Sequence, residues 1–270
     1  MSGMRFSDRS DDAPGSDVAA LEHVWVGAPR GPGVPVLVFL HEGLGSVAMW
    51  RSFPSEVCDS AGVSGFVYSR RGYGRSPPRP PEEHWGTDFL HVQADDVLPR
   101  LLAHHGIERP FLFGHSDGGS IALLHAARHA VEGLVVLAPH LFVEDLSIAS
   151  IREAATAYAS HDLRRRLAKY HDDPDSAFHG WHDAWLSPAF RGWNIEAEIA
   201  SIACPVFAMQ GTEDIYGSME QIRAIDRQLT GKVRLLEIPG CGHSPHRDQP
   251  ALVGREAARF IRDVRSRKPS

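Results

Sequence analysis

Residues 111–124 have the sequence Phe-Leu-Phe-Gly-His-Ser-Asp-Gly-Gly-Ser-Ile-Ala-Leu-Leu, a short apolar run followed by a turn and an apolar segment with helical spacing. This order predicts a buried strand that turns sharply into a helix, with Ser116 at the apex. Gly114 and Gly118 lie two residues before and after the serine, where larger side chains would collide across the turn. Ser116 is therefore expected in a strained conformation that lifts its hydroxyl clear of the sheet, beside the free N–H groups of the new helix.

Further strands and helices are predicted on both sides of this turn. Nearly continuous apolar runs, typical of strands covered on both faces, occur at 34–40, 65–69, 133–137, 204–210 and 233–238. Helical patterns lie between or after them, at about 50–61, 88–105, 119–129, 218–229 and 250–264. Because strands alternate with helices, we expect an α/β fold with a mostly parallel central sheet flanked by helices. Residues 19–26 are expected to add one edge strand.

The alternation stops between about residue 140 and residue 199. This segment holds no convincing buried strand, and its helical patterns lie at 148–159, 163–170 and 176–186. Nearly sixty residues are too many for a loop in a compact domain, so we expect a helical cap inserted over the edge of the sheet. The expected division is a core domain of residues 1–139 and 200–270 and a cap insertion of residues 140–199.

The composition is that of an ordinary globular protein, with 43% hydrophobic and 23% charged residues in 270. Its 28 basic and 34 acidic residues give a net charge of −6, which argues against nucleic acid or an anionic membrane as a partner. No apolar run is long enough to span a membrane. A small molecule is the expected substrate, and the sequence leaves open whether the protein is a monomer or a homodimer.

The N-terminal residues and the cysteines bear on the compartment. Residues 1–17 are polar, lack the apolar core of a signal peptide and are expected to form a flexible lead. Cys58, Cys204 and Cys241 form no disulfide framework, since one at least would be left unpaired. A cytoplasmic location is therefore expected.

A base and an acid for Ser116 are expected directly after later strands. A serine hydroxyl attacks only when a base takes its proton, and that base needs an acid to hold its tautomer. Asp214 lies in the loop after the strand at 204–210, and His243 lies in the loop after the strand at 233–238. The order Ser, Asp, His, each beyond the end of a buried strand, is that of the α/β-hydrolase arrangement.

Two neighbouring residues compete for these roles. His246 is an alternative base, but His243 follows a glycine directly after the loop and is favoured. Glu213 is an alternative acid. The position in the loop favours Asp214 over Glu213, but less strongly than His243 is favoured over His246.

The chain resembles the α/β-hydrolase superfamily over nearly its whole length, with matching motifs at 41–46, 71–76, 114–118, 211–214 and 242–243. The predicted insertion lies where that superfamily carries its cap. The resemblance implies Ser116 as the nucleophile, Asp214 as the orienting acid and His243 as the base, with no cofactor. It also implies an oxyanion hole made by the backbone N–H groups of Asp117 and Gly43, with Leu44 as an alternative to Gly43.

One position departs from the superfamily pattern. Members usually have His-Gly at the start of the first loop, and this chain has His41-Glu42. A carboxylate near the oxyanion site would oppose the negative charge that develops there. We therefore expect Glu42 to point away from the site or to pair with an arginine such as Arg71 or Arg75.

The predicted cap contains histidines and aromatic residues that need an interpretation. His179 and His182 share a helix face at a spacing that metal ligands use, but no helix offers a further His or Glu at matching spacing, so no metal site is expected. The large aromatic residues are expected to pack the cap onto the core, with one or two lining the pocket; they are Trp181, Trp185, Phe190 and Trp193.

The favoured function is that of a serine hydrolase that cleaves a carboxylic ester, thioester or lactone of a small to medium-sized molecule through an acyl-enzyme. Capped relatives with the same triad also hydrolyse carbon–carbon bonds in compounds of aromatic catabolism. Some members of the fold are non-catalytic ligand-binding proteins, which is a second alternative. A third alternative is an acyltransferase, in which an alcohol replaces water. An arginine or lysine facing Ser116 would indicate an acidic substrate, and an apolar wall would indicate a neutral ester.

Overall fold

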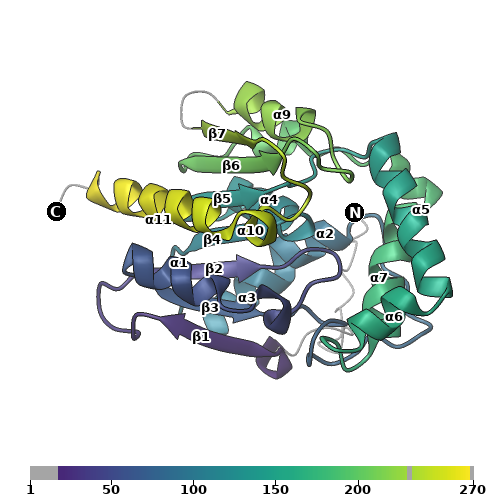
Figure 1. The fold of residues 1–270 in the computed structure, drawn as a ribbon. Coiled ribbons are helices and arrows are strands. Elements are labelled where there is room, and N and C mark those ends of the chain that lie inside the picture. The colour runs from purple at the N-terminus through teal and green to yellow at the C-terminus, as the bar shows by residue number, and fades with distance from the viewer. Residues whose placement is uncertain (1–17, 230–232, 268–270) are drawn as a thin grey trace, which may run out of the picture.

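Seven strands form one sheet in the order β1-β3-β2-β4-β5-β6-β7 (Figure 1). They are β1 His23–Gly27, β2 Val36–Leu40, β3 Ser64–Tyr68, β4 Phe111–His115, β5 Gly133–Leu137, β6 Val206–Gly211 and β7 Val233–Ile238. β1 is antiparallel to β3, and every other neighbouring pair is parallel. The predicted α/β fold with a mostly parallel sheet is confirmed. The computed structural model describes residues 18–229 and 233–267, and the predicted flexible lead at 1–17 lies outside them.

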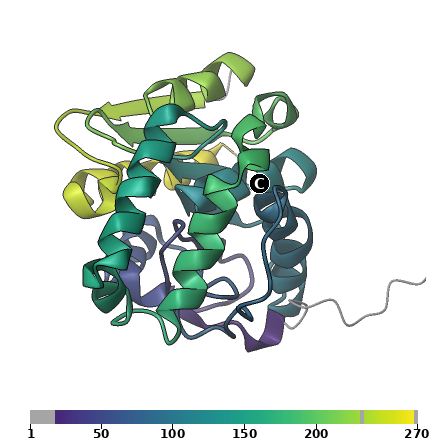
Figure 2. The ribbon, with the colours of Figure 1, turned by 90° about the vertical axis from the view of Figure 1, so that its right-hand side faces the viewer.

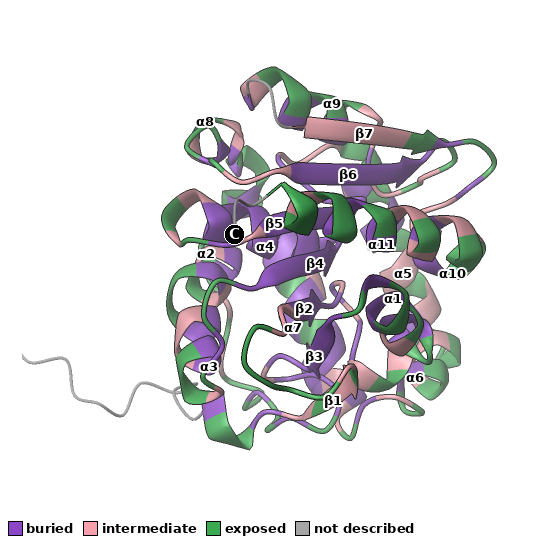
Figure 3. Cartoon of the chain, turned by 90° about the vertical axis from the view of Figure 1, so that its left-hand side faces the viewer, coloured by how far each residue is buried: buried purple, intermediate pink, exposed green. Residues whose placement is uncertain are grey.

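Helices cover both faces of the sheet, because alternate residues of each buried strand point to opposite sides. One face packs against α1 (Phe53–Ala61) and α11 (Pro250–Ser266). The other face packs against α2 (Phe89–Val92), α3 (Leu98–His104), α4 (Asp117–Arg128) and α9 (Glu220–Gln228). Figure 3 shows the result: β6 inside the sheet is buried throughout, while β7 at the edge is mostly half-buried.

The differences from the predicted elements lie mainly at their ends. β1 begins at His23 rather than at residue 19, because Val18–Ala20 form a short 3-10 turn. The helix predicted at 88–105 contains a π-helical turn, Gln93–Val97, between α2 and α3. Pro99 lacks the N–H that would continue the α-helical ladder to Asp95, which accounts for the altered turn.

Between β5 and β6 the chain forms four α-helices, α5 (Asp145–Ala159), α6 (Asp162–Leu167), α7 (Pro174–Leu186) and α8 (Glu196–Ile199), and a short 3-10 helix, Pro188–Gly192. Figure 1 shows α5, α6 and α7 beside the edge at which the parallel strands end, and Figure 2 shows α5 and α7 side by side across that edge. The loops that carry chemistry in parallel α/β sheets lie at this same edge. Within the described residues, no helix is long and apolar enough to cross a membrane.

Candidate active site

Ser116 occupies the turn between β4 and α4 with φ 52° and ψ −119°, the strained conformation that the sequence predicts. Close packing leaves room only for glycine at the positions two residues before and two residues after Ser116. A Cβ at Gly114 would lie 2.3 Å from the carbonyl oxygen of Gly118, and a Cβ at Gly118 would lie 2.1 Å from that of Leu40. Both obstacles are backbone atoms that cannot rotate away, so these two glycines hold the serine at the apex.

Ser116, His243 and Asp214 form a continuous chain of hydrogen bonds. The Ser116 Oγ donates to Nε2 of His243 at 3.0 Å. Nδ1 of His243 donates to both carboxylate oxygens of Asp214 at 2.9 Å. Because the carboxylate only accepts, this arrangement keeps the proton on Nδ1 and leaves Nε2 free to take one from the serine.

Asp214 is held in its charged form although its side chain is only 1% exposed. Burial by itself would raise the pKa of Asp214, but the hydrogen bond and charge of His243 and the backbone N–H of Tyr216 outweigh it. The pKa therefore lies below its usual value, and the carboxylate is ionised at neutral pH.

The competing residues lie outside this chain. Glu213 is exposed at the surface. The ring of His246 packs against Trp50 and Phe53, and its nitrogens have no hydrogen-bond partner among the described residues. His243 is therefore the histidine that reaches Ser116.

A cavity of about 200 Å³ lies beside Ser116 at the carboxyl ends of the strands. Gly43, Leu44 and Asp117 line it together with Ser116 and His243, while Asp214 lies behind His243. As the first residue of α4, Asp117 has an N–H with no acceptor inside the helix. The structure thus brings all of the predicted site residues to one place.

The opposite wall of this cavity comes from the helices between β5 and β6. It is mostly apolar and consists of Ser147 and Ile151 from α5, Leu163 and Leu167 from α6, and Trp181 and Trp185 from α7. The prediction that one or two of the aromatic residues line the pocket is confirmed by these two tryptophans.

A buried arginine that the sequence analysis missed connects the two predicted oxyanion donors. Arg70 donates to the carbonyl oxygens of His41 at 2.9 Å and Glu42 at 3.1 Å, and lies 3.8 Å from Oδ2 of Asp117. Oδ1 of Asp117 accepts from Nε1 of Trp185 at 3.1 Å. Burial raises the pKa of Asp117, and Arg70 and Trp185 act in the opposite direction. The sequence feature that could have identified Arg70 is its position directly after a predicted buried strand.

His140 is the second residue that the sequence analysis did not identify. It lies three residues after Leu137, the last residue of β5, and it lines the same cavity as Ser116. Its ring lies 4.9 Å from that of Trp185 and 5.8 Å from that of His243. Its position just beyond a strand end was the signal that could have identified it.

Glu42 pairs with an arginine, but the two arginines suggested from the sequence are wrong. Its Oε1 lies 3.1 Å from Arg247, and its Oε2 lies 3.4 Å from Nδ1 of His115. Arg71 instead holds Glu83 through two hydrogen bonds of 2.6 and 2.7 Å. Burial would raise the pKa of Glu42, but His115 and Arg247 lower it well below its usual value, so Glu42 is a paired carboxylate.

The histidines considered as metal ligands lie on α7 with a third potential ligand, Asp183. One atom of each of His179, His182 and Asp183 lies within 4.8 Å of the others. His179 and Asp183 are nearly half exposed, and Asp183 is close to both rings, an arrangement of solvated charges on a helix surface.

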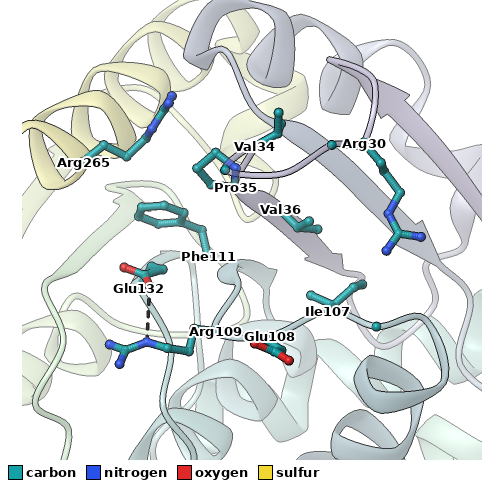
Figure 4. Close-up of a pocket in the computed structure, with 13 residues that line it drawn as sticks. Arg30, Val34, Pro35, Val36, Ile107, Glu108, Arg109, Phe111, Glu132 and Arg265 are labelled. Atoms are coloured by element: carbon teal, nitrogen blue, oxygen red, sulfur yellow. Dashed lines mark ion pairs between the residues drawn. The ribbon is translucent and has the colours of Figure 1, made fainter. Parts of the chain in front are cut away.

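A larger cavity, of about 700 Å³, lies at the other end of the sheet (Figure 4). It opens between the first residues of β2 and β4, Val36 and Phe111, and an ion pair between Arg109 and Glu132 borders it. Ser116 follows the last residue of β4, so the length of the sheet separates this cavity from the nucleophile. The smaller cavity is therefore the candidate active site.

Comparison with known proteins identifies the family to which this fold belongs. The model of the alpha/beta hydrolase family matches residues 37–256. The 2-succinyl-6-hydroxy-2,4-cyclohexadiene-1-carboxylate synthase of Enterobacter sp. (strain 638) is 24% identical over 262 residues, which cover 86% of this chain and 93% of the synthase.

Two solved structures illustrate the shared architecture. Proline iminopeptidase of Mycobacterium smegmatis is similar with a TM-score of 0.72 and 17% identity, covering 92% of this chain and 97% of that one. The enol-lactonase from Burkholderia xenovorans LB400 is similar with a TM-score of 0.67 and 19% identity, covering 89% and 96%. At such low sequence identity, the structural similarity to these two proteins shows a shared fold only.

Proposed function

The chain belongs to the alpha/beta hydrolase family, and from that premise we propose that it is a serine hydrolase acting on a carboxylic ester, thioester or lactone. The observation that carries the proposal is the hydrogen-bonded chain from Ser116 through His243 to Asp214, beside a cavity. A hydroxyl with an imidazole to accept its proton, and a carboxylate to hold that imidazole, is the arrangement that attack on a carbonyl requires. The cavity volume of about 200 Å³ favours a small substrate.

In the first step the Ser116 Oγ attacks the carbonyl carbon while Nε2 of His243 takes its proton. Asp214 stabilises the imidazolium that forms. The backbone N–H groups of Asp117 and Gly43 hold the oxygen on which negative charge develops. His243 then gives its proton to the leaving alcohol or thiol, and an acyl group remains on Ser116.

In the second step a water molecule cleaves the acyl-enzyme, with His243 again acting first as the base and then as the acid. His243 takes a proton from the water, the resulting hydroxide attacks the acyl carbon, and Ser116 recovers its proton as the acid leaves. In this proposal residues 140–199 form a cap that excludes bulk water and shapes the substrate cavity.

Arg70 supports this chemistry from behind the site. Its bonds to the carbonyl groups of His41 and Glu42 fix the peptide groups that precede Gly43. Its positive charge offsets the carboxylate of Asp117, which would otherwise oppose the developing oxyanion.

A fluorophosphonate probe tests the assignment, because it reacts with activated serines. We expect the wild type to be labelled and Ser116→Ala to be unlabelled, with hydrolysis of p-nitrophenyl esters reduced to background. Ser201→Ala changes an exposed serine away from the site and should be labelled like the wild type. Full labelling of Ser116→Ala would refute the nucleophile, and an unlabelled wild type that binds a ligand tightly would favour a non-catalytic binding protein.

A further inference from the structure

His140 presents an imidazole to the cavity wall without a protein partner. The residue is 3% exposed, and its ring makes no hydrogen bond with the residues that the structure describes; Nδ1 in particular is buried and unpaired. Most buried polar atoms in native proteins are hydrogen-bonded, and leaving one unpaired costs about 1–3 kcal/mol. The fold tolerates this cost in a residue that lines the same cavity as Ser116.

The backbone holds the ring firmly in this position. Ala138, the first residue after β5, has φ 43°, a left-handed conformation that is unfavourable for any residue with a Cβ. The Ser120 Oγ donates to the His140 carbonyl oxygen at 2.6 Å and accepts from its N–H at 3.0 Å. Oε1 of Gln221 accepts from the N–H of Leu141 at 2.7 Å. Local strain held by several hydrogen bonds is characteristic of segments that position a functional side chain.

The charge state of the ring limits what it can bind. Burial, reinforced by the nearby His243, lowers the pKa of His140 to about 3, so the ring is neutral at pH 7. A neutral imidazole offers one N–H donor and one acceptor nitrogen. A hydroxyl group can bond to either nitrogen, by donating to the acceptor or accepting from the N–H, and a carbonyl oxygen can only accept from the N–H.

The rest of the cavity argues against an ionic substrate. Among the described residues that line it, Arg247 supplies the one guanidinium, and Glu42 already neutralises it. Much of the surrounding wall is apolar, formed by side chains such as Met49, Ile151 and Leu167. The hydroxyl of Ser147, which also lines the cavity, already donates to the carbonyl oxygen of Tyr216. A carboxylate or phosphate on the substrate would lose its hydration there without gaining an unpaired cation.

We propose that His140 is a specificity residue and that the substrate is a small neutral ester or lactone, apolar except for one further hydroxyl or carbonyl oxygen that bonds to the His140 ring. The inference rests on the proposed function and narrows its substrate class. An oxygen at this place would bond to one nitrogen of the ring, while the alkyl part of the substrate would contact the apolar side chains from α5, α6 and α7.

Pairs of esters that differ by one oxygen test this assignment. Butanoate, 3-hydroxybutanoate and 3-oxobutanoate esters of one alcohol place the oxygen in the acyl part, and butyl and hydroxybutyl esters of one acid place it in the alcohol part. For at least one pair we expect the wild type to favour the oxygenated ester in kcat/KM by about threefold to tenfold, the worth of one neutral hydrogen bond.

Variants at this position separate the hydrogen bond from packing. His140→Leu should abolish the preference, and His140→Asn, which keeps a donor and an acceptor, should retain part of it. Ile151→Val trims the apolar wall and should change both members of a pair together, leaving their ratio unaltered.

The outcomes separate this inference from the proposed function. A preference that persists unchanged in His140→Leu overturns the role of His140. A wild type that favours no oxygenated ester overturns it too, whether or not the variants fold. Failure of the proposed function appears instead as a missing fluorophosphonate label on Ser116, which does not depend on the ester used.

Discussion

Arg70 is the residue on which the charge balance of the site depends. It is buried with the Asp117 carboxylate, and it also holds the carbonyl groups of His41 and Glu42. One guanidinium therefore serves both segments that carry the proposed oxyanion donors. Its planar fork of donors suits this task, which a lysine, with one point charge, would perform poorly.

We predict that Arg70→Met lowers kcat/KM by about 10²–10³-fold, the typical effect of disturbing one oxyanion-hole donor. It should also cost roughly 3 kcal/mol of stability, since the buried Asp117 loses its cation. Ester kinetics and urea unfolding measure the two effects. Arg71→Met is the matched control, because Arg71 pairs with Glu83 nearer the surface and its loss should cost at most about 1 kcal/mol.

The double variant Arg70→Met/Asp117→Asn distinguishes positioning from folding. Removing the unpaired carboxylate should restore much of the stability, while the loop around Gly43 still lacks its support and the rate stays low. Recovery of both stability and rate would show that Arg70 acts through folding alone.

Helix α7 is the element that connects the segment between β5 and β6 to the site. It begins where the Asp173 side chain accepts from the N–H of Ser176 at 2.9 Å, with Pro174 in the first turn. Phe178, Trp181 and Trp185 recur at helical spacing and bury one stripe of the helix. Trp185 bonds to the side chain of Asp117, and Trp181 packs on Gly43, so α7 touches both residues that carry the proposed oxyanion donors.

Gly43→Ala should disturb this contact, because the added Cβ would lie 2.2 Å from Cδ1 and Nε1 of Trp181. Overpacking of this kind costs about 1–3 kcal/mol, and we expect the melting temperature and ester hydrolysis to fall together. Trp181→Leu in the same chain should recover part of the loss. Gly192→Ala, where a Cβ meets nothing within 4 Å, should shift stability by at most about 0.5 kcal/mol.

Thermal unfolding of the two single variants and the double variant measures the coupling between Gly43 and Trp181. Substitutions of two residues in direct contact should not have additive effects on the free energy of unfolding. Strictly additive effects would therefore mean that α7 does not contact the loop after β2.

The molecule as a whole buries an unusual number of neutral histidines. Burial lowers the pKa of each of six, namely His41, His105, His125, His140, His171 and His246. The values for His125 and His140 fall to about 4 and about 3. On unfolding, these rings return to the ordinary value near 6.5 and take up protons that the folded protein excludes.

We predict that stability falls as the pH drops from 7 to 5. Above about pH 6.5 neither state is protonated, so the histidines cost nothing. Below it the unfolded chain binds protons at His125 and His140, whereas the folded protein keeps both rings neutral down to about pH 4. This difference favours unfolding by up to about 1.4 kcal/mol per pH unit for each of these two histidines, and the others act in the same direction. Urea unfolding at pH 7, 6 and 5 measures this slope.

His125→Gln is the control for the acid prediction. It removes one buried imidazole outside the candidate site, where Nδ1 of His125 pairs with the carbonyl oxygen of Ala94. The unfolded chain of this variant takes up one proton fewer, so the slope of the free energy of unfolding against pH should be correspondingly smaller. Equal stability at pH 7 and pH 5 in the wild type would contradict the prediction.

The turn at Ser116 and the alternation of strands and helices were predictable from the sequence, because they depend on residues a few positions apart. The backbone of Gly118 excludes a side chain at Gly114 locally, whereas the obstacle at Gly118 is the backbone of Leu40 at the end of β2. Strand periodicity requires only neighbours. The positions of Asp214 and His243 after later strands followed from the same rule, since the carboxyl ends of parallel strands meet at one edge.

The contacts among distant segments were decided only by the tertiary structure. Glu42 and Arg247 lie 205 residues apart in the chain, and Trp185 of α7 reaches Asp117 across 68 residues. The burial that leaves the His140 ring neutral and unpaired likewise arises from packing against Trp185 and His243. The sequence by itself determined the fold and the order of the candidate triad. The partners and charge states around that triad depend on the packing of segments far apart in the chain, which no local spacing encodes.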